Sequence, residues 1–245
     1  MLPVVLLLAW EYYASQGRLP RYFPAPSSIG LQWLEMAGSG ELLRNTVWSL
    51  YRALAAFALG AFFGALAGLL SGTVGAVERF LDPIISLTYP IPKIAALPIV
   101  FALFGLGELS KIVIICISVF FPAYLAAFSG AKATSRVHVW AARNMGARPV
   151  QVFFRVVLPS ALPEFFNGLR VALAFSFIVM FVAEVVSSTK GLGHLIVFAE
   201  ENTRFDIMYV AIISIGIIGL LADRLLLAVR SRLLVGQLAV TEGGR

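Results

Sequence analysis

Three charged side chains stand alone within long apolar runs and are the strongest candidates for chemistry in this sequence. Lys93 follows Pro92, while Arg170 and Glu184 interrupt the run 165–189. A charge in such surroundings is costly and is usually paired or functional. For Lys93 the sequence leaves three interpretations: a structural contact with an acidic partner or with backbone carbonyls, attraction of an anionic substrate, or a side chain that extends to the lipid edge.

Arg170 and Glu184 are separated by fourteen positions. On one helix they project within about 40° of each other but lie about 21 Å apart along the axis, so they do not pair with each other. We expect Arg170 to anchor or contact the basic segment 130–163, which is described below. Glu184 keeps two interpretations: a packing or gating network, or a role at the mouth of a pathway.

Several kinds of chemistry lack the residues that they need. The sequence has no Gly-x4-Gly-Lys-Ser/Thr phosphate loop, so the chain does not bind ATP in that way. Cys116 is the only cysteine, and His138 and His194 have no clustered acidic or thiol ligands at a zinc-like spacing. Both histidines lie outside the apolar runs, where they cannot serve a buried nucleophile as a base. No catalytic, metal or cofactor site is therefore predicted in this chain.

The composition indicates which solvent surrounds the protein. Of the 245 residues, 60% are hydrophobic and 13% are charged, whereas soluble domains carry about 25% charged residues. A chain this apolar is surrounded largely by a lipid bilayer. The net charge of +6 does not indicate nucleic-acid binding, because the basic residues lie at the ends of apolar runs and form no stripe with interleaved aromatics.

Five apolar runs are long enough to cross a bilayer as helices, which takes about 20 residues. They cover 53–77, 82–108, 112–131, 165–189 and 207–229. A sixth run, 1–14, reaches only about 21 Å as a helix. It has no basic residue before it and no small-residue cleavage site after it, so we interpret it as a short or trimmed first span rather than a signal peptide. The predicted fold class is all-α, a polytopic bundle of about six transmembrane helices that forms one domain over 1–245.

The distribution of charge orients this bundle. With six spans, segment 130–163 shares a compartment with both termini, and this segment and the C-terminal tail are rich in Lys and Arg, whereas the connections 105–110 and 187–206 are near neutral or acidic. Basic loops stay in the cytoplasm. We therefore expect cytoplasmic termini, and an external loop over 15–45 with a helix over 27–38 along the membrane surface.

Glycines recur at every fourth position of the second span. They are Gly60, Gly64, Gly68 and Gly72. This spacing places them on one helix face, where the missing side chains let another helix approach closely in a solvent that provides little hydrophobic drive between helices. We expect this face to pack inside the bundle.

Prolines interrupt the third span. They are Pro83, Pro90, Pro92 and Pro98. Each removes a backbone donor, and a membrane tolerates this only where protein or water satisfies the freed carbonyls. We expect a broken, kinked helix that lines a cavity. Lys93, Pro92 and Glu184 are therefore the candidates for a translocation path or its gate.

Segment 130–163 is the least membrane-like part of the chain between two spans. Thr134 or Ser135 can cap a helix that runs through Met145. Gly146 can take the left-handed conformation that ends this helix.

A second helix follows in the same segment. Pro149 suits its first turn; it runs through Arg155, and Leu158-Pro159 ends it. Both helices are basic on one face and apolar on the other. Such a pair is typical of elements that press into a groove on another protein.

The same residues form an ordered pattern, Ala141-Ala142-x3-Gly146-x9-Val156-x-Leu158-Pro159. This pattern resembles the cytoplasmic EAA loop of ATP-binding-cassette importer permeases, Glu-Ala-Ala-x3-Gly-x9-Ile-x-Leu-Pro. Trp140 stands where that family usually has Glu, and Val156 where it usually has Ile.

The resemblance extends over about 49–232. It includes Pro92-Lys93-x-Ala95-x2-Pro98, Phe104-Gly105-x-Gly107-Glu108, Val182-Ala183-Glu184, Gly191-Leu192-Gly193-His194-Leu195-Ile196 and Asp223-Arg224. The ordered set is similar to that of importers of nitrate, sulfonates, taurine and thiamine-pyrimidine precursors.

The resemblance implies a type I importer permease, multi-pass in the inner membrane of a bacterium or archaeon. It would work as a homodimer with two cytoplasmic ATPase subunits, which bind ATP and Mg, and with an external solute-binding protein. The chain itself would be no enzyme and would form the path for a small polar solute.

The resemblance also implies which residues couple the permease to the ATPase. Those that match the EAA pattern, with two neighbours added by helical adjacency, are Ala141, Ala142, Arg143, Met145, Gly146, Leu158 and Pro159. The alternative function is an ion-gradient-driven secondary transporter. Such folds often contain internal repeats with paired broken helices, and no convincing repeat is present.

Overall fold

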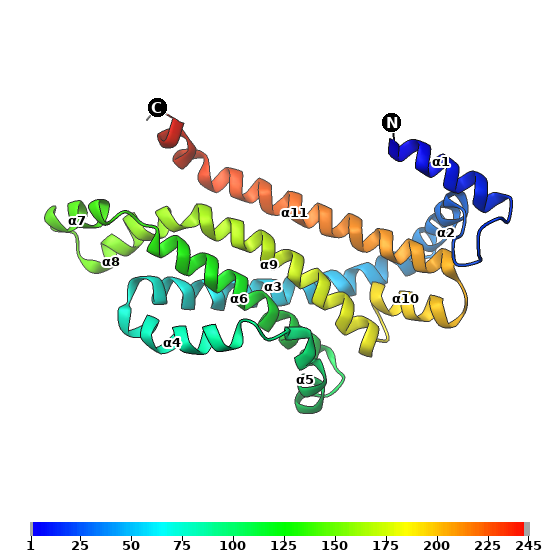
Figure 1. Ribbon diagram of the computed structural model, residues 1–245, viewed down its shortest axis with the longest axis horizontal. Helices are drawn as coiled ribbons and strands as arrows, with labels where there is room; N and C mark the ends of the chain where they lie inside the picture. Colours follow the sequence, from blue (N-terminus) through cyan, green and yellow to red (C-terminus); the bar gives the residue numbers. More distant parts are fainter. Residues whose placement is uncertain (1, 243–245) are drawn as a thin grey trace. The chain divides into compact units, whose positions relative to one another are not determined.

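The computed structural model describes the backbone of residues 2–242 and the side chains as far as residue 234. Within these residues the chain forms helices joined by turns, with no strand (Figure 1). The all-α prediction is therefore confirmed. The chain divides into two compact units, and three long helices contribute residues to both: α3 (Glu41–Thr73), α9 (Leu158–Ser187) and α11 (Phe205–Glu242).

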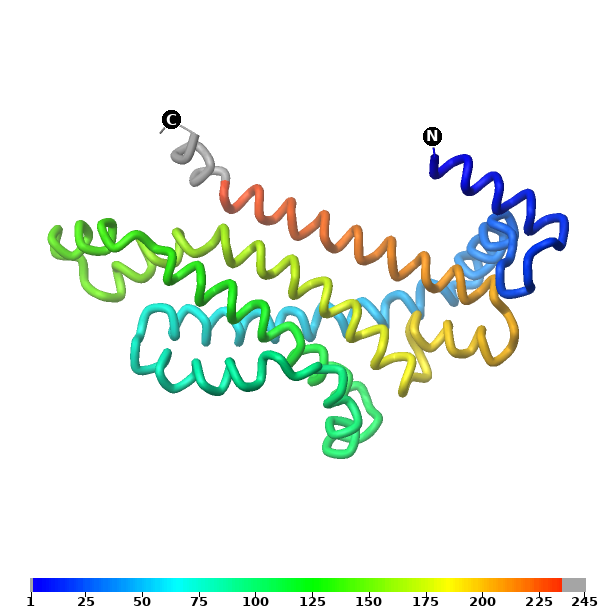
Figure 2. The backbone as a smooth tube through the Cα atoms, viewed as in Figure 1, coloured from blue at the N-terminus to red at the C-terminus, as the bar shows by residue number. Residues whose placement is uncertain are grey.

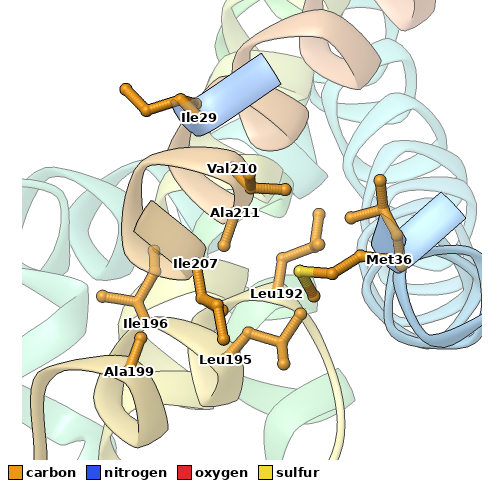
Figure 3. Packing of buried hydrophobic residues seen from close by; sticks show 10 residues of the cluster. Ile29, Met36, Leu192, Leu195, Ile196, Ala199, Ile207, Val210 and Ala211 are labelled. Carbon is orange, nitrogen blue, oxygen red and sulfur yellow. The ribbon is translucent and has the colours of Figure 1, made fainter. Parts of the chain in front are cut away.

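The first unit comprises Met1–Arg52 and Met180–Leu220. Besides parts of the long helices it contains α1 (Leu2–Ser15), α2 (Pro26–Gly38) and α10 (Leu192–Glu201). Its apolar core is formed by side chains of α2, α10 and the start of α11, most of them labelled in Figure 3, together with Leu42 of α3. A helix thus forms over Pro26–Gly38, where one was expected over 27–38, and its buried residues tie it to its unit; its place along the membrane surface stays a prediction.

The second unit comprises Ala53–Val179 and Leu221–Arg245. Figure 2 shows how the chain reverses direction at the turn after α3. Its further elements are α4 (Gly75–Thr88), the 3₁₀ turn η1 (Lys93–Ala96), α5 (Leu97–Phe104), α6 (Glu108–Lys132), α7 (Arg136–Asn144), α8 (Pro149–Val152) and the π-helical turn η2 (Phe153–Val157).

Within residues 2–242, four helices are long and apolar enough to cross a membrane, and a bent pair of helices would be a fifth span if it crosses as one. The four are α3, α6, the continuous helix Pro149–Ser187 and the stretch Phe205–Leu234 of α11. Each of these four helices contains most of one predicted run; the four runs are 53–77, 112–131, 165–189 and 207–229. The N-terminal run forms α1, an apolar helix of 14 residues; its interpretation as a short or trimmed first span stays a prediction.

The third predicted span is broken, as its prolines indicate. The segments Gly75–Thr88 and Lys93–Phe104 are bent by 87° relative to each other. Pro90 and Pro92 lie in the break, and Pro98 lies in the first turn of α5, where a missing N–H leaves no helical bond unmade. The break follows from proline chemistry, because two prolines within three residues cannot continue the hydrogen-bond ladder.

The glycine face of α3 packs against the backbone of α6. A Cβ atom at Gly60 would lie 2.6 Å from the Cys116 carbonyl oxygen, and one at Gly64 would lie 2.6 Å from the Phe120 carbonyl oxygen. One at Gly72 would lie 2.5 Å from the Ala131 Cβ. No real Cβ atom tolerates such distances, so the four-residue spacing fixes how closely the two helices approach.

Replacing Gly64 by Leu is expected to lower the free energy of unfolding by about 1–3 kcal/mol or more, because the side chain must displace the backbone of α6. The measurement is thermal or denaturant unfolding of the purified protein in detergent. Gly216→Leu is the control, since a Cβ at Gly216 meets nothing within 4 Å. Equal stability of the two variants would contradict the proposed close packing.

Candidate functional site

The basic segment forms a helical hairpin of α7 and α8, with a tight turn at Gly146. Gly146 has φ +81°, the left-handed conformation that was predicted to end the first helix. Its N–H donates to the Arg143 carbonyl at 2.9 Å, and the Ala147 N–H donates to the Ala142 carbonyl at 3.0 Å. This pair of bonds is a Schellman motif, which satisfies the last carbonyls of α7 and reverses the chain.

One face of the hairpin is buried and the other is open. Ala142 is half-buried against a small apolar cluster that includes Val152 and Val157. On the open face, Trp140 is 60% exposed and Met145 is 81% exposed. Large apolar side chains exposed together mark an interaction surface more often than a plain solvated face.

The predicted coupling residues differ in exposure, and two of them, Leu158 and Pro159, lie at the start of α9 rather than in the hairpin. Ala141, Arg143, Met145 and Gly146 are exposed, whereas Ala142, Leu158 and Pro159 are half-buried. No partner chain is present in the structure, so their coupling role stays a prediction.

The second helix of the hairpin does not end at Leu158-Pro159, and this prediction was wrong. The chain continues from α8 through the π-helical turn η2 into α9. The carbonyl that the Pro159 ring would crowd in an α-helix belongs to Arg155, and Arg155 lies within η2. We attribute the continuity to this wider turn, which relieves the clash and lets the helix proceed.

In the first unit, the carboxylate of Glu184 is the centre of a buried polar network. Arg52 Nη1 donates to Oε1 at 2.5 Å, and both side chains are almost completely inaccessible to solvent. The Ser49 hydroxyl lies 2.9 and 2.8 Å from the two carboxylate oxygens. The Gly193 N–H donates to Oε2 at 2.9 Å. A carboxylate without water requires such a set of donors.

The same network fixes the connection between α9 and α10. Arg52 also donates to the Lys190 carbonyl at 2.8 Å. The Leu192 N–H donates to the Ser49 hydroxyl at 2.9 Å, and the Gly191 N–H donates to Asn45 Oδ1 at 2.8 Å. The orphan N–H groups at the start of α10 are thereby satisfied by side chains of α3 and α9.

Two glycines let this turn reach the carboxylate. Gly191 has φ +112°, and a Cβ there would lie 2.5 Å from the Glu184 carboxylate oxygens. A Cβ at Gly193 would lie 2.6 Å from the Glu184 Cβ. The Gly-x-Gly spacing is therefore required by contact with Glu184.

Sequence reasoning missed the partners of Glu184 on α3. Asn45, Ser49 and Arg52 follow each other at spacings of four and three residues, which places them on one helix face. A polar stripe of this kind at the end of an apolar span was a detectable signal. Of the two interpretations of Glu184, the structure shows the packing network; a role at a pathway or gate stays a prediction.

Lys93 holds the end of a broken helix. Its ammonium group donates to the carbonyls of Thr88, Tyr89 and Ile91, and it lies 4.0 Å from the centroid of the Phe121 ring. These carbonyls lie at the C-terminal end of α4 and just after it, where a cation is favourable. The structure thus shows the carbonyl contact that was one interpretation of Lys93. Its place on a translocation path, with that of Pro92, stays a prediction.

Arg170 does not pair with the basic segment, contrary to our expectation. It forms a bidentate pair with Asp223 of α11, with Nε–Oδ1 2.6 Å and Nη2–Oδ2 2.9 Å. Segment 130–163 contains no acidic residue and therefore offers no carboxylate. A guanidinium prefers the planar two-bond geometry that Asp223 supplies.

Removing one partner of the buried pair is expected to destabilise the protein strongly. Glu184→Ala leaves the Arg52 charge buried without its carboxylate, and we expect a loss of about 3–5 kcal/mol in the free energy of unfolding. The double variant Arg52→Met/Glu184→Ala should lose less than the sum of the single changes Arg52→Met and Glu184→Ala, because no uncompensated charge remains. Unfolding of all four proteins in detergent measures this, and additive losses would contradict direct coupling.

Comparisons with known proteins are consistent with this geometry. A family described as "Binding-protein-dependent transport system inner membrane component" matches residues 60–235. The taurine transport system permease protein TauC of Escherichia coli is 35% identical over 237 residues, which are 95% of this chain and 86% of TauC. SsuC of Bacillus subtilis, provisionally named an aliphatic sulfonates transport permease protein, is 31% identical over 235 residues, 96% of this chain and 85% of SsuC.

The fold has a solved counterpart. A chain of the MetNI methionine ABC transporter, in inward-facing conformations, aligns with a TM-score of 0.62 at 20% identity over 79% of this chain and 98% of that chain. This likeness supports a type I importer permease fold. The matched family is one of multi-pass inner-membrane subunits, which implies an ATPase and a solute-binding protein as partners. The chain belongs to this family and is the permease subunit of an ATP-binding-cassette importer.

Proposed function

We propose that the solute carried by this permease is taurine or a related aliphatic sulfonate. The observation that carries the proposal is the similarity to TauC and SsuC over nearly the whole chain, at 35% and 31% identity. Of the solute types implied by the sequence motifs, these are the ones that the relatives' names support.

We propose further that the α7–α8 hairpin is the element that couples the permease to its ATPase. Its open face combines exposed Trp140 and Met145 with basic residues, which suits a groove on another protein. The Schellman turn at Gly146 gives the hairpin a fixed shape, so it can transmit a displacement. ATP and Mg would be bound by that partner and not by this chain.

The remaining parts of the assembly are proposed on the same basis. A second copy of the permease completes the path, and the binding protein delivers solute from outside. The basic hairpin and both termini lie in the cytoplasm, because positively charged segments remain there. Lys93, Pro92 and Glu184 act on the path or its gate through the helix ends and turns that they hold. The ion-gradient alternative has no such support.

Measuring taurine uptake in proteoliposomes, with and without ATP or an ion gradient, tests this function. Purified permease alone is expected to hydrolyse no ATP and to move no taurine. With its ATPase subunit and binding protein, it should take up taurine or ethanesulfonate when ATP is supplied. Uptake by the permease alone in response to a proton or sodium gradient would contradict the importer mechanism, and ATP-driven complexes that move no sulfonate would contradict the substrate.

Gly146→Val is expected to uncouple transport from ATP hydrolysis. A left-handed φ costs an ordinary residue about 1–2 kcal/mol, and a Cβ at Gly146 would meet nothing within 4 Å, so the effect is backbone strain in the turn. The readout is taurine taken up per ATP hydrolysed, which should fall several-fold.

Two further variants make this test specific. Gly146→Asn should keep most of the coupling, because Asn tolerates the left-handed region. Gly17→Val also places a Val at a positive φ, +65°, where a Cβ meets nothing within 4 Å, but it lies outside the hairpin and should preserve the ratio. Wild-type coupling in Gly146→Val would refute the role of this turn.

A further inference from the structure

A polar pocket of about 390 Å³ lies in the first unit and adjoins the buried network, with which it shares Asn45 and Lys190. The first turns of α3 contribute Glu41, Arg44 and Trp48 to its lining, the connection before α10 contributes Lys190, and α10 contributes His194. This volume falls within the range of small-molecule sites, about 300–1,000 Å³.

The base of the pocket is held rigidly. Asn45 and Leu195 line it and are 4% and 3% exposed. Both polar atoms of the Asn45 side chain are engaged, since its amide nitrogen donates to the Glu41 carbonyl at 3.0 Å and its oxygen accepts the Gly191 N–H at 2.8 Å. The network around Glu184 therefore positions the pocket wall without occupying the pocket.

The charges at the rim are available to a ligand. In the part of the chain whose side chains are described, Arg44, Lys190 and Glu41 form no salt bridge. Lys190 Nζ lies 4.6 Å from the centroid of the Trp48 ring, which holds the ammonium group at the pocket without neutralising it. By contrast, Arg52, which also lies over Trp48 at 5.6 Å, is occupied by Glu184.

We propose that this pocket binds the sulfonate group of a small organic anion, with Arg44 and Lys190 as its ligands. This inference rests on the proposed function, which supplies the substrate class. Two cations at a concave site favour an oxyanion, and Leu195 and Phe198 supply apolar lining for the short carbon chain. Under the proposed orientation the pocket lies on the external side, so solute released by the binding protein meets it before it crosses the membrane.

Glu41 adds a distinction within the sulfonates. It is the acidic residue in the pocket lining, three positions before Arg44 on the same helix. Taurine carries an ammonium group two carbons from its sulfonate, whereas ethanesulfonate has the same carbons and no ammonium group. The pocket therefore has complementary charges for both ends of taurine and for one end of ethanesulfonate.

Equilibrium binding to the permease–ATPase complex in lipid nanodiscs, without binding protein, tests this site. Radiolabelled taurine is the probe, and unlabelled ethanesulfonate is the competitor. Arg44→Gln/Lys190→Gln should weaken both ligands about 10-fold or more, as expected for the loss of hydrogen bonds to a charged group. Glu41→Gln should weaken taurine several-fold and leave ethanesulfonate unchanged or tighter.

The control variant is Arg18→Gln/Arg21→Gln. It also removes two positive charges, but from exposed positions of the first unit outside the pocket. It should leave the affinities for taurine and ethanesulfonate unchanged. Because Arg44 and Lys190 are exposed as well, unfolding temperatures of all variants should match that of the wild type.

The outcomes separate this site from the proposed function. Wild-type complex that binds neither compound, or binds both with affinities that the pocket variants do not alter, would overturn the site. If such a complex still takes up sulfonates with ATP and binding protein, the substrate proposal stands. If Glu41→Gln weakens the two ligands equally, the role of Glu41 in recognising an ammonium group is wrong.

Discussion

The carboxylate of Glu184 is buried in a protein whose solvent is lipid, and this constraint organises the first unit. A buried carboxylate must find its hydrogen-bond donors within the protein. Arg52 supplies the charge, Ser49 a hydroxyl and Gly193 a backbone N–H. Arg52 and Ser49 belong to α3, Gly193 belongs to α10, and Glu184 itself lies near the end of α9. The hydrogen bonds of one side chain therefore hold parts of three helices together.

The glycines of the chain serve close contact in two different ways. Along α3 the glycine face allows a backbone-to-backbone approach to α6, which replaces the hydrophobic drive that lipid does not provide. At Gly191 and Gly193 the absence of a Cβ instead leaves room for a carboxylate. In both cases a side chain would occupy space already taken by backbone or by charge.

Charged side chains within the predicted spans bind the carbonyls at a helix end or pair with a charge on a neighbouring helix. Lys93 satisfies carbonyls at the break after α4, and Arg170 joins α9 to α11 through Asp223. The pocket beside the network is different, because Arg44 and Lys190 are not used in this way. Cations without a salt bridge, next to a network whose hydrogen bonds are already formed, are the arrangement expected for ligand binding. The network need not rearrange when the ligand binds.

The sequence by itself determined the class of the molecule. Apolar runs, the four-residue glycine period, the prolines of the third span and the turn at Gly146 each act within a single helix or turn, so their consequences could be derived locally. The tertiary structure decided which charges meet. Arg52 and Glu184 are 132 positions apart, and local spacing carries no information about such a pair. It also decided that the helix continues through Leu158-Pro159, because the π-helical turn Phe153–Val157 widens the backbone at Arg155, whose carbonyl the Pro159 ring would otherwise crowd.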